Sequence, residues 1–377
     1  MVSGIRYLAP ASGHNPLMLI GRIVDEIAAL GPMRFDRFME IALYDPEGGF
    51  FGSGRLRSHR TGDFLTSPEV SPLFGETLAR FVVAERDRIG HLDAVVDCGA
   101  GSGSLLAALL PGLDGTAGVA VEKSPAARES LRERLPGVGV LDSLDEFPGG
   151  RYGVIVANEL VDNLPAAVAV RVDGAWVEEA VTSEGGQLVA TQVAARPGVA
   201  AWAERHAPGL PEGSRVEVQL AAAAWLRSAL ASLRAGSVVV IDYGGTSDGL
   251  SGRRASGTVR TYRAHHLGPD PLLEPGSTDI TMDVDFSALA AVVEECGATV
   301  EYSSQADFLT RWGLRDRLTD LRHRELEAAR GSDTMERLMF RSRVTEAETL
   351  LHPRGLGDFR VLVARKSLPA ARFPLPA

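Results

Sequence analysis

A glycine-rich turn at residues 97–103, with the sequence DCGAGSG, constrains the fold of this chain more than any other feature. It continues the apolar run 94–96 and leads into a second apolar stretch that ends near Leu110. Glycine adopts backbone conformations closed to bulkier residues and lets a ligand approach the backbone closely. A helix N-terminus adds free amides and a partial positive charge. The pattern predicts a strand, a ligand-binding turn and a helix.

Strand-like and helix-like runs alternate through the middle of the chain. Predicted strands lie at 93–98, 118–122, 138–141, 152–158 and 237–243, and predicted helices at 102–110, 125–135 and 220–233. Such alternation predicts an α/β fold, with a mainly parallel sheet and helices on both faces. Ligands of such sheets bind at the edge where the carboxyl ends of the strands meet.

The regions on either side of residue 90 contain other patterns. The N-terminal part predicts helices at 17–30 and 35–42, and one further helix from Pro68 to Glu85. Between residues 165 and 192 the spacing of apolar residues changes to the alternation typical of strands. Asp173-Gly174 and Gly185-Gly186 are hairpin signals within this stretch. We expect an N-terminal helical extension and an inserted antiparallel β segment.

The spacing of the glycines separates two classes of nucleotide-like ligand. The dinucleotide fingerprint GxGxxG fails here because residue 104 is serine. Gly99, Gly101 and Gly103 follow an acidic residue, Asp97, in the GxGxG form typical of S-adenosylmethionine enzymes. There the acid can engage the ammonium group of the ligand. Glu122 ends the next predicted strand, where an acid can bind both ribose hydroxyls, although it would suit NAD equally well.

Two further loops belong to the same edge of the predicted sheet. Asp142, Ser143 and Leu144 follow the third strand, where an acceptor and an apolar cover would serve an adenine ring. An ordinary loop in which Asp142 caps a helix explains that aspartate equally well.

The fourth strand ends in the segment ANELVDNLP, whose Asn158, Glu159 and Asp162 are our candidate catalytic residues. Two carboxylates three residues apart on one side of a helical turn could hold a cationic substrate or take its proton. A capped helix start with solvated acids is the alternative.

Composition limits the other classes of function. A net charge of −10 disfavours nucleic-acid binding, which needs a basic surface. With only Cys98 and Cys296, the chain offers no disulfide framework and no cysteine-ligated zinc site, and we expect no metal. We also expect no membrane insertion and a cytoplasmic location, because no apolar stretch reaches spanning length. A homodimer is a further expectation.

Several long motifs in fixed order resemble the MidA family, which includes the mitochondrial complex I assembly factor 7 proteins. They are GDFLTSPEVSPLFGE (62–76), DCGAGSG (97–103), ANELVDNLP (157–165), VIDYGG (240–245), GTVRTYRAHH (257–266) and DITMDVDF (279–286). The resemblance implies a Rossmann-like class I methyltransferase fold with an N-terminal helical extension and an insertion. It divides the chain into an extension with a cofactor-covering loop (1–90), a methyltransferase domain (91–366) with an insertion at about 165–215, and a tail (367–377).

The resemblance also implies roles for individual residues. Gly99, Gly101 and Gly103 would bind S-adenosyl-L-methionine, with Asp97 in place of the family's usual glutamate. Glu159 and Asp162 would lie beside the methyl donor, and Asn163 replaces a usually small residue. The residues that would cover the cofactor from the N-terminal side are Asp63, Phe64, Thr66 and Ser67.

The family's mitochondrial members symmetrically dimethylate an arginine on a complex I subunit, so the expected partner is a protein substrate with a target arginine. A methyltransferase with a small-molecule acceptor, as in a biosynthetic pathway, is the first alternative. A noncatalytic assembly factor that keeps the fold is the second, although the intact acids and glycines argue against it. A NAD-dependent oxidoreductase is the third, and Ser104 disfavours it.

Overall fold

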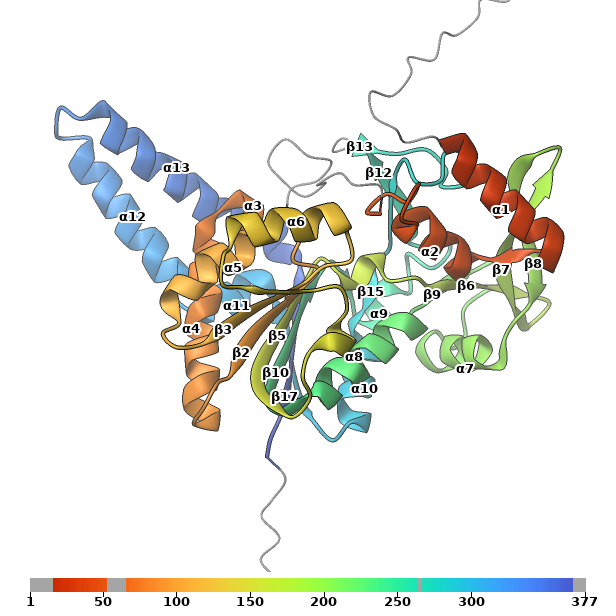
Figure 1. The fold of residues 1–377 in the computed structure, drawn as a ribbon, viewed down its shortest axis with the longest axis horizontal. Coiled ribbons are helices and arrows are strands. Elements are labelled where there is room, and N and C mark those ends of the chain that lie inside the picture. Colours follow the sequence, from red (N-terminus) through yellow and green to blue (C-terminus); the bar gives the residue numbers. More distant parts are fainter. Residues whose placement is uncertain (1–15, 53–65, 264–265, 369–377) are drawn as a thin grey trace, which may run out of the picture.

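The computed structural model describes residues 16–52, 66–263 and 266–368. Its centre is a twisted sheet in the strand order β16-β17-β10-β5-β2-β3-β4 (Figure 1). The strands are β2 (Ala94–Cys98), β3 (Ala117–Val121), β4 (Gly139–Leu141), β5 (Arg151–Asn158), β10 (Leu233–Asp242), β16 (Thr299–Ser304) and β17 (Arg360–Lys366). Neighbouring strands from β4 to β10 pair in parallel, whereas β17 is antiparallel to both β10 and β16. The expected mainly parallel α/β sheet is confirmed.

The strand order places a topological switch at the centre of the sheet. From β2 the chain moves outward to β3 and β4, then returns to form β5 on the other side of β2. Cys98 of β2 and Ala157 of β5 are register partners, so the turns that follow them emerge side by side. Ligands of open α/β sheets bind in the crevice at such a switch.

Helices cover both faces of this sheet. One face packs on α4 (Pro72–Ile89), α5 (Ser104–Leu109), α11 (Gln305–Arg311), α12 (Leu314–Ala328) and α13 (Thr334–Leu350). The other face packs on α8 (Leu220–Ser232) and α10 (Phe286–Glu295). Strands β2, β5 and β10 are almost wholly buried, as their continuous apolar runs require when both faces are covered. Helix α6 (Pro125–Arg134) follows β3.

The helical hairpin of α12 and α13 projects away from the sheet (Figure 1). The sequence of residues 335–349 predicts a polar helix, which corresponds to α13, but we assigned no helix to the residues of α12. Leu314, Leu318 and Leu321 are buried at helical spacing, and this was the signal for the missed helix. The many charged residues between them obscured that stripe.

The predicted helix from Pro68 to Glu85 is wrong in one respect, because the structure divides it into α3 (Ser67–Val70) and α4. The break falls at Ser71, which has an extended backbone with φ −157° and ψ 138°. Pro72 follows, and proline disfavours helical geometry in the residue before it. The Ser71 hydroxyl accepts a hydrogen bond from the Leu73 amide and so caps α4.

The inserted segment forms a second, antiparallel sheet. Its strands are β6 (Ala167–Val172), β7 (Ala175–Glu184), β8 (Gln187–Ala194) and β9 (Arg215–Val218), and β1 (Met33–Arg34) joins from the N-terminal extension. Asp173 and Gly174 both have positive φ at the β6–β7 turn, as expected for this hairpin signal. Helix α7 (Pro197–His206) lies between β8 and β9.

Helices α1 (Pro16–Leu30) and α2 (Phe35–Tyr44) pack on this second sheet through one apolar cluster. The N-terminal extension and the insertion thus form one lobe beside the central sheet (Figure 1). The remaining elements are α9 (Ser247–Leu250), β11 (Gly244–Gly245) paired with β15 (Val284–Asp285), and a small sheet of β12 (Arg260–Arg263), β13 (His266–Leu267) and β14 (Asp279–Thr281). The domain boundaries inferred from the sequence remain a prediction.

Candidate active site

The glycine turn lies at the carboxyl end of β2, where the switch places it. Gly99, Gly101 and Gly103 have φ of 75°, 50° and 79°, a region that residues with a Cβ atom rarely adopt. A Cβ on Gly99 would lie 3.2 Å from Cδ1 of Leu160. The turn therefore depends on glycine for its backbone conformation.

Gly103 has a different role from the other two glycines. It does not line the cavity described below, and a Cβ there would lie 2.6 Å from Leu131 Cδ2 and 2.8 Å from Leu135 Cδ1. Because Gly103 has no side chain, α5 can approach α6 closely. In the described residues Gly103 thus serves the packing of α5 against α6, and its expected contact with the cofactor remains a prediction.

Glu122 and the glycine turn are joined directly. The Gly101 amide donates to Glu122 Oε2 at 2.9 Å, and the Ser124 amide donates to Oε1 at 2.8 Å. Burial nevertheless raises the pKa of Glu122, because these donors only partly replace water. The carboxylate lies at the end of β3 and lines the cavity, as predicted.

Asp97 is a buried carboxylate that lines the same cavity. Asp97 is 3% exposed, and no described residue donates a hydrogen bond to its carboxylate. Burial, together with the nearby charge of Glu122, raises the pKa of Asp97 to about 7. Burying a carboxylate without hydrogen-bond donors costs free energy, unless a ligand provides a donor or a positive charge.

The far end of the cavity is formed by the loop after β4 and by α8. Asp142, Ser143 and Leu144 line it together with Trp225 and Ser228. The alternative in which Asp142 caps a helix is wrong, because Ser143 caps the following short 3₁₀ turn through a bond from the Asp145 amide at 3.2 Å. Asp142 instead approaches Lys123, with 3.4 Å between the Oδ1 and Nζ atoms.

The carboxyl end of β5 supplies two polar side chains to the cavity, Asn158 and Glu159. Asn158 Nδ2 and the Ser67 amide both donate to Glu159 Oε1 at 3.2 Å. Asn158 Oδ1 is buried and has no hydrogen-bond partner among the described residues. Burial, and next the charge of Asp162, raises the pKa of Glu159 to about 8.

Our expectation that Glu159 and Asp162 share one side of a helical turn is wrong. Glu159 has a left-handed backbone with φ 51°, and the 3₁₀ turn begins only at Val161. Asp162 does not line the cavity. Its Oδ2 atom accepts from Thr281 Oγ1 at 2.6 Å and from the Tyr243 hydroxyl.

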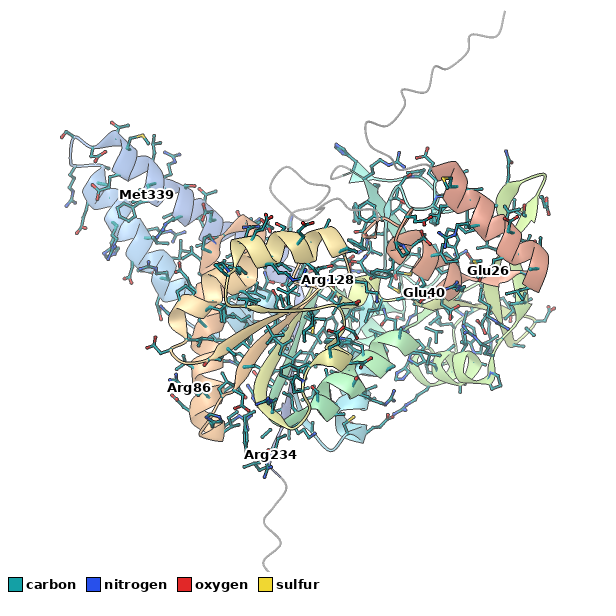
Figure 2. All side chains as sticks on the ribbon, in the orientation of Figure 1. Glu26, Glu40, Arg86, Arg128, Arg234 and Met339 are labelled. Atoms are coloured by element: carbon teal, nitrogen blue, oxygen red, sulfur yellow. The ribbon has the colours of Figure 1, made fainter. Side chains whose placement is uncertain are left out.

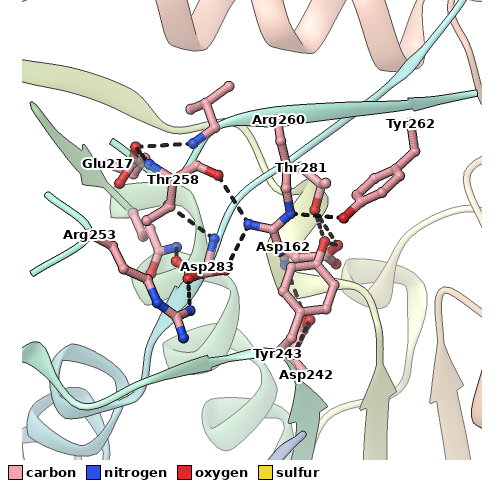
Figure 3. Close-up of polar contacts among 12 residues, drawn as sticks. Asp162, Glu217, Asp242, Tyr243, Arg253, Thr258, Arg260, Tyr262, Thr281 and Asp283 are labelled. Atoms are coloured by element: carbon pink, nitrogen blue, oxygen red, sulfur yellow. Dashed lines mark hydrogen bonds and ion pairs between the residues drawn. The ribbon is translucent and has the colours of Figure 1, made fainter. Parts of the chain in front are cut away.

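Asp162 belongs to a polar network whose carboxylates are buried (Figure 3). Arg260 lies over the Tyr243 ring at 4.6 Å from its centroid, and its guanidinium pairs with Asp283 at 2.8 Å. Asp242 accepts the amides of Val161 and Asp162 at 3.0 and 3.2 Å. This network connects β10 and β14 to the turn after Glu159, so Asp162 holds the turn in place.

The N-terminal extension closes the cavity from the other side. Glu40, Tyr44 and Phe51 line it, as does Thr66, one of the predicted covering residues. Ser67 does not line it, but its amide bonds to Glu159 and its hydroxyl lies 3.3 Å from Gln305 Oε1. The predicted residues Asp63 and Phe64 lie outside the described residues.

Asn163, the residue that departs from the family pattern, also lines the cavity. Its amide nitrogen donates to Asp279 Oδ1 at 2.8 Å and to the Ile280 carbonyl at 3.0 Å. The side chain is therefore fixed toward β14, and its bulk is accommodated by the small sheet.

The complete cavity has a volume of about 590 Å³, within the range of small-molecule sites. Its described lining holds seven carboxyl side chains and one lysine, Lys123. Sequence reasoning missed Glu40, Tyr44, Phe51, Trp225 and Ser228, since these come from helices and turns outside the motifs. Such a lining favours a cationic ligand.

Comparison with protein families assigns the chain. Residues 77–304 match the family described as S-adenosyl-L-methionine-dependent methyltransferase. The chain belongs to this family of methyltransferases. S-adenosyl-L-methionine is its cofactor, as the sequence predicted.

Two relatives and a solved structure agree with this assignment. The protein arginine methyltransferase NDUFAF7, mitochondrial, of Danio rerio is 27% identical, over 80% of this chain and 78% of its own length. The Drosophila melanogaster homolog of that name is 27% identical, over 76% of this chain and 72% of its own. A COG1565 superfamily member from Burkholderia thailandensis, bound to S-adenosyl-homocysteine, is 31% identical with a TM-score of 0.83, and 96% of each chain is covered.

The site of this methyltransferase fits its cofactor. Asp97 is a buried acceptor without a donor, and the cofactor's ammonium group can supply one. Glu122 stands at the end of β3, where ribose hydroxyls can replace its bond to Gly101. Leu144 and Trp225 offer apolar surface to the adenine.

The described residues contain neither a candidate membrane span nor a candidate metal site. None of the described helices is both long and apolar enough to cross a membrane. No cluster of three or more histidine, cysteine or acidic side chains suited to a metal ion occurs in the described parts of the chain.

Proposed function

We propose that this methyltransferase transfers the methyl group to a guanidinium nitrogen of an arginine in a protein substrate. One observation carries the proposal: the end of β5 holds two acceptor atoms, Asn158 Oδ1 and the second oxygen of Glu159, to which no described residue donates. Asn158 Oδ1 is buried without a partner in the part of the chain that the structure describes, and burial and the charge of Asp162 raise the pKa of the neighbouring Glu159 carboxyl to about 8. Guanidinium carries five N–H donors and a permanent charge, so it can satisfy both groups together.

Bound S-adenosyl-L-methionine would supply the reaction with a methyl group on a positively charged sulfur. Glu159 and Asn158 would orient the guanidinium so that one nitrogen faces this methyl group. As the nitrogen–carbon bond forms, the carbon–sulfur bond breaks with its electron pair left on sulfur. The nitrogen must lose one proton, and the Glu159 carboxylate accepts it.

The names of the relatives support the same acceptor, since the similar Danio rerio and Drosophila melanogaster proteins are called protein arginine methyltransferases. Symmetric dimethylation and a link to respiratory complex assembly are parts of this proposal that stand on the sequence resemblance alone. The cytoplasmic location and the homodimer also remain predictions, and the relatives are named mitochondrial.

The test uses extract from a host strain that lacks the protein. The extract is incubated with purified wild-type protein and tritiated S-adenosylmethionine, and the labelled proteins are hydrolysed for identification of methylated arginines by mass spectrometry. We expect label in protein arginine, mainly as symmetric dimethylarginine, and none with the Glu159→Gln variant.

Two other outcomes would overturn the proposal in different ways. Label found only in the low-mass fraction would identify a small-molecule methyltransferase. Calorimetric binding of S-adenosyl-homocysteine without any label would identify a noncatalytic protein that keeps the fold.

A further inference from the structure

A second cavity of about 610 Å³ adjoins the cofactor cavity, between the N-terminal helices and the insertion. We infer that it is the groove in which the acceptor polypeptide lies on one side of its target arginine, with an aliphatic side chain seated in it. This inference rests on the proposed function. We refer to this second cavity as the extension groove, and its described lining is Glu26, Leu30, Gly31, Pro32, Met33, Arg34, Asp36, Arg37, Glu40, Pro165, Ala167, Arg196, Val218, Leu220 and Ala221.

The extension groove is continuous with the active site. Glu40 and Pro165 line both cavities. The chain itself runs from one to the other, since the segment that begins with Asn158 and Glu159 in the cofactor cavity continues through Pro165 to Ala167 in the groove. A polypeptide whose arginine reaches Glu159 can therefore extend into the groove.

Glu40 and Glu26 mark the direction of the groove along the extension (Figure 2). Arg37 connects them, with its guanidinium 2.8 Å from Glu40 and 3.0 Å from Glu26. Glu40 is exposed and lies where the two cavities meet. It stands at the point where a cationic side chain would pass from the groove toward the cofactor.

The other arginines of the groove are neutralised by partners. Arg34 pairs with buried Glu178 at 2.7 Å, and Arg196 pairs with Asp36 at 2.6 Å and with Glu178 at 2.8 Å. The guanidinium groups are therefore neutralised and do not repel a cationic peptide. Because these charges are already paired, they offer little binding energy to an additional charged residue.

The extension groove offers a peptide exposed apolar surface. Leu30 is 81% exposed at the end of α1, and Leu220 is 40% exposed at the start of α8. Pro32, Pro165 and Ala221 add to the same lining. An aliphatic side chain of a peptide, seated between these residues, would bury part of this apolar surface. A small acceptor would have no use for this second cavity, whereas an extended peptide fills it.

The walls of the groove belong to the parts added to the methyltransferase core. One wall is the N-terminal extension, through α1, β1 and α2, and the other comes from the insertion, through β6 and β9, with the start of α8. The same lobe closes the cofactor cavity through Tyr44 and Phe51. The groove for the acceptor and the cover of the cofactor cavity thus belong to one structural unit.

The test uses a degenerate peptide library with one fixed central arginine and tritiated S-adenosylmethionine. We expect the wild-type protein to prefer peptides with an aliphatic residue at a fixed offset from the arginine. In the double variant Leu30→Gln/Leu220→Gln this preference should disappear, and the KM for a preferred peptide should rise about tenfold. The single variant Leu30→Gln, at an exposed helix end, should show a smaller rise.

The control variant is Leu326→Gln, an exposed leucine of α12 that lies outside both cavities. It should keep the wild-type peptide preference and KM. Calorimetry with S-adenosyl-homocysteine shows that each variant is folded with its cofactor site intact.

Each remaining outcome counts against the inference. Methylation of arginine peptides without any flanking preference, or with a preference that both groove variants keep, would overturn the groove while the proposed function stands. A smaller molar mass of the variants by light scattering would assign the groove to a second copy of the chain. Absence of any labelled arginine peptide with wild-type protein would refute the proposed function and the groove together.

Discussion

The backbone amide of Ser67 donates to the Glu159 carboxyl at 3.2 Å, and these residues lie 92 positions apart in the chain. Ser67 is fully buried at the start of α3, while Glu159 follows β5 with a left-handed backbone. The bond therefore couples the N-terminal extension to the catalytic edge of the central sheet. It also leaves the second oxygen of Glu159 for a substrate, which is the basis of the first prediction.

The Glu159→Gln variant should lose catalysis while it keeps its cofactor. Glutamine can still accept the Ser67 amide, but it cannot take a proton, so turnover should fall ~100-fold or more. The measurement is initial rate with tritiated S-adenosylmethionine, beside calorimetry with S-adenosyl-homocysteine. Glu184→Gln, an exposed glutamate at the turn between β7 and β8, is the matched control. Unchanged turnover in Glu159→Gln would remove Glu159 from the mechanism.

The rate should depend on pH through the same carboxyl. Burial raises the pKa of Glu159 to about 8, so below that pH the group is protonated and cannot act as a base. We expect kcat/KM to rise with pH and to level off above about 8, since this ratio reports the ionisation of the free enzyme. The arginine substrate stays protonated over this range and adds no change of its own. A flat profile in the wild-type protein would contradict this assignment.

Asp97→Asn should stabilise the cofactor-free protein near neutral pH and weaken cofactor binding. Burial and Glu122 raise the pKa of Asp97 from 3.8 to about 7. The folded state therefore binds this proton more tightly than the unfolded state, and stability falls as the pH rises through about 7. Removing the acid should raise the free energy of unfolding by ~1–3 kcal/mol above that pH.

Thermal melts of both proteins at several pH values, with and without S-adenosyl-homocysteine, measure the Asp97 effect. Saturating ligand should stabilise the wild-type protein by ~3 kcal/mol at a hundredfold excess over Kd, and Asp97→Asn much less at the same concentration. Equal ligand stabilisation of the two proteins would show that Asp97 does not contact the cofactor.

Gly103→Ala should destabilise the fold through packing. The added Cβ would lie 2.6 Å from Leu131 Cδ2, and the backbone has φ 79°. Backbone strain and overpacking together should cost ~2–4 kcal/mol of unfolding free energy. Gly115→Ala is the matched control, with φ 72° and open space around the position, and should cost only ~1 kcal/mol. The free energy of unfolding of both variants is measured by chemical denaturation. Equal losses in Gly103→Ala and Gly115→Ala would show that the contact with α6 is unimportant.

Local patterns were enough to predict most of the central sheet. Apolar runs such as those of β2, β5 and β10 are buried on both faces, so their composition alone marks them as strands. The hairpin at Asp173-Gly174 was also predictable, because few residue pairs tolerate positive φ at both positions. The break at Ser71 could have been predicted as well, since Pro72 restricts the residue before it.

The sequence by itself determined the strand, the glycine turn at residues 97–103 and the helix that follows it, because each depends on neighbouring residues. The GxGxG spacing after Asp97 determined the class of cofactor, because Ser104 breaks the dinucleotide fingerprint, whereas Glu122 suits either class. Only the tertiary structure decided that Asp162 faces Tyr243 and Thr281, that Gly103 serves packing, and that Tyr44 and Trp225 line the cavity. These roles depend on contacts between segments far apart in the chain, and no local pattern records which distant side chain will occupy the neighbouring space.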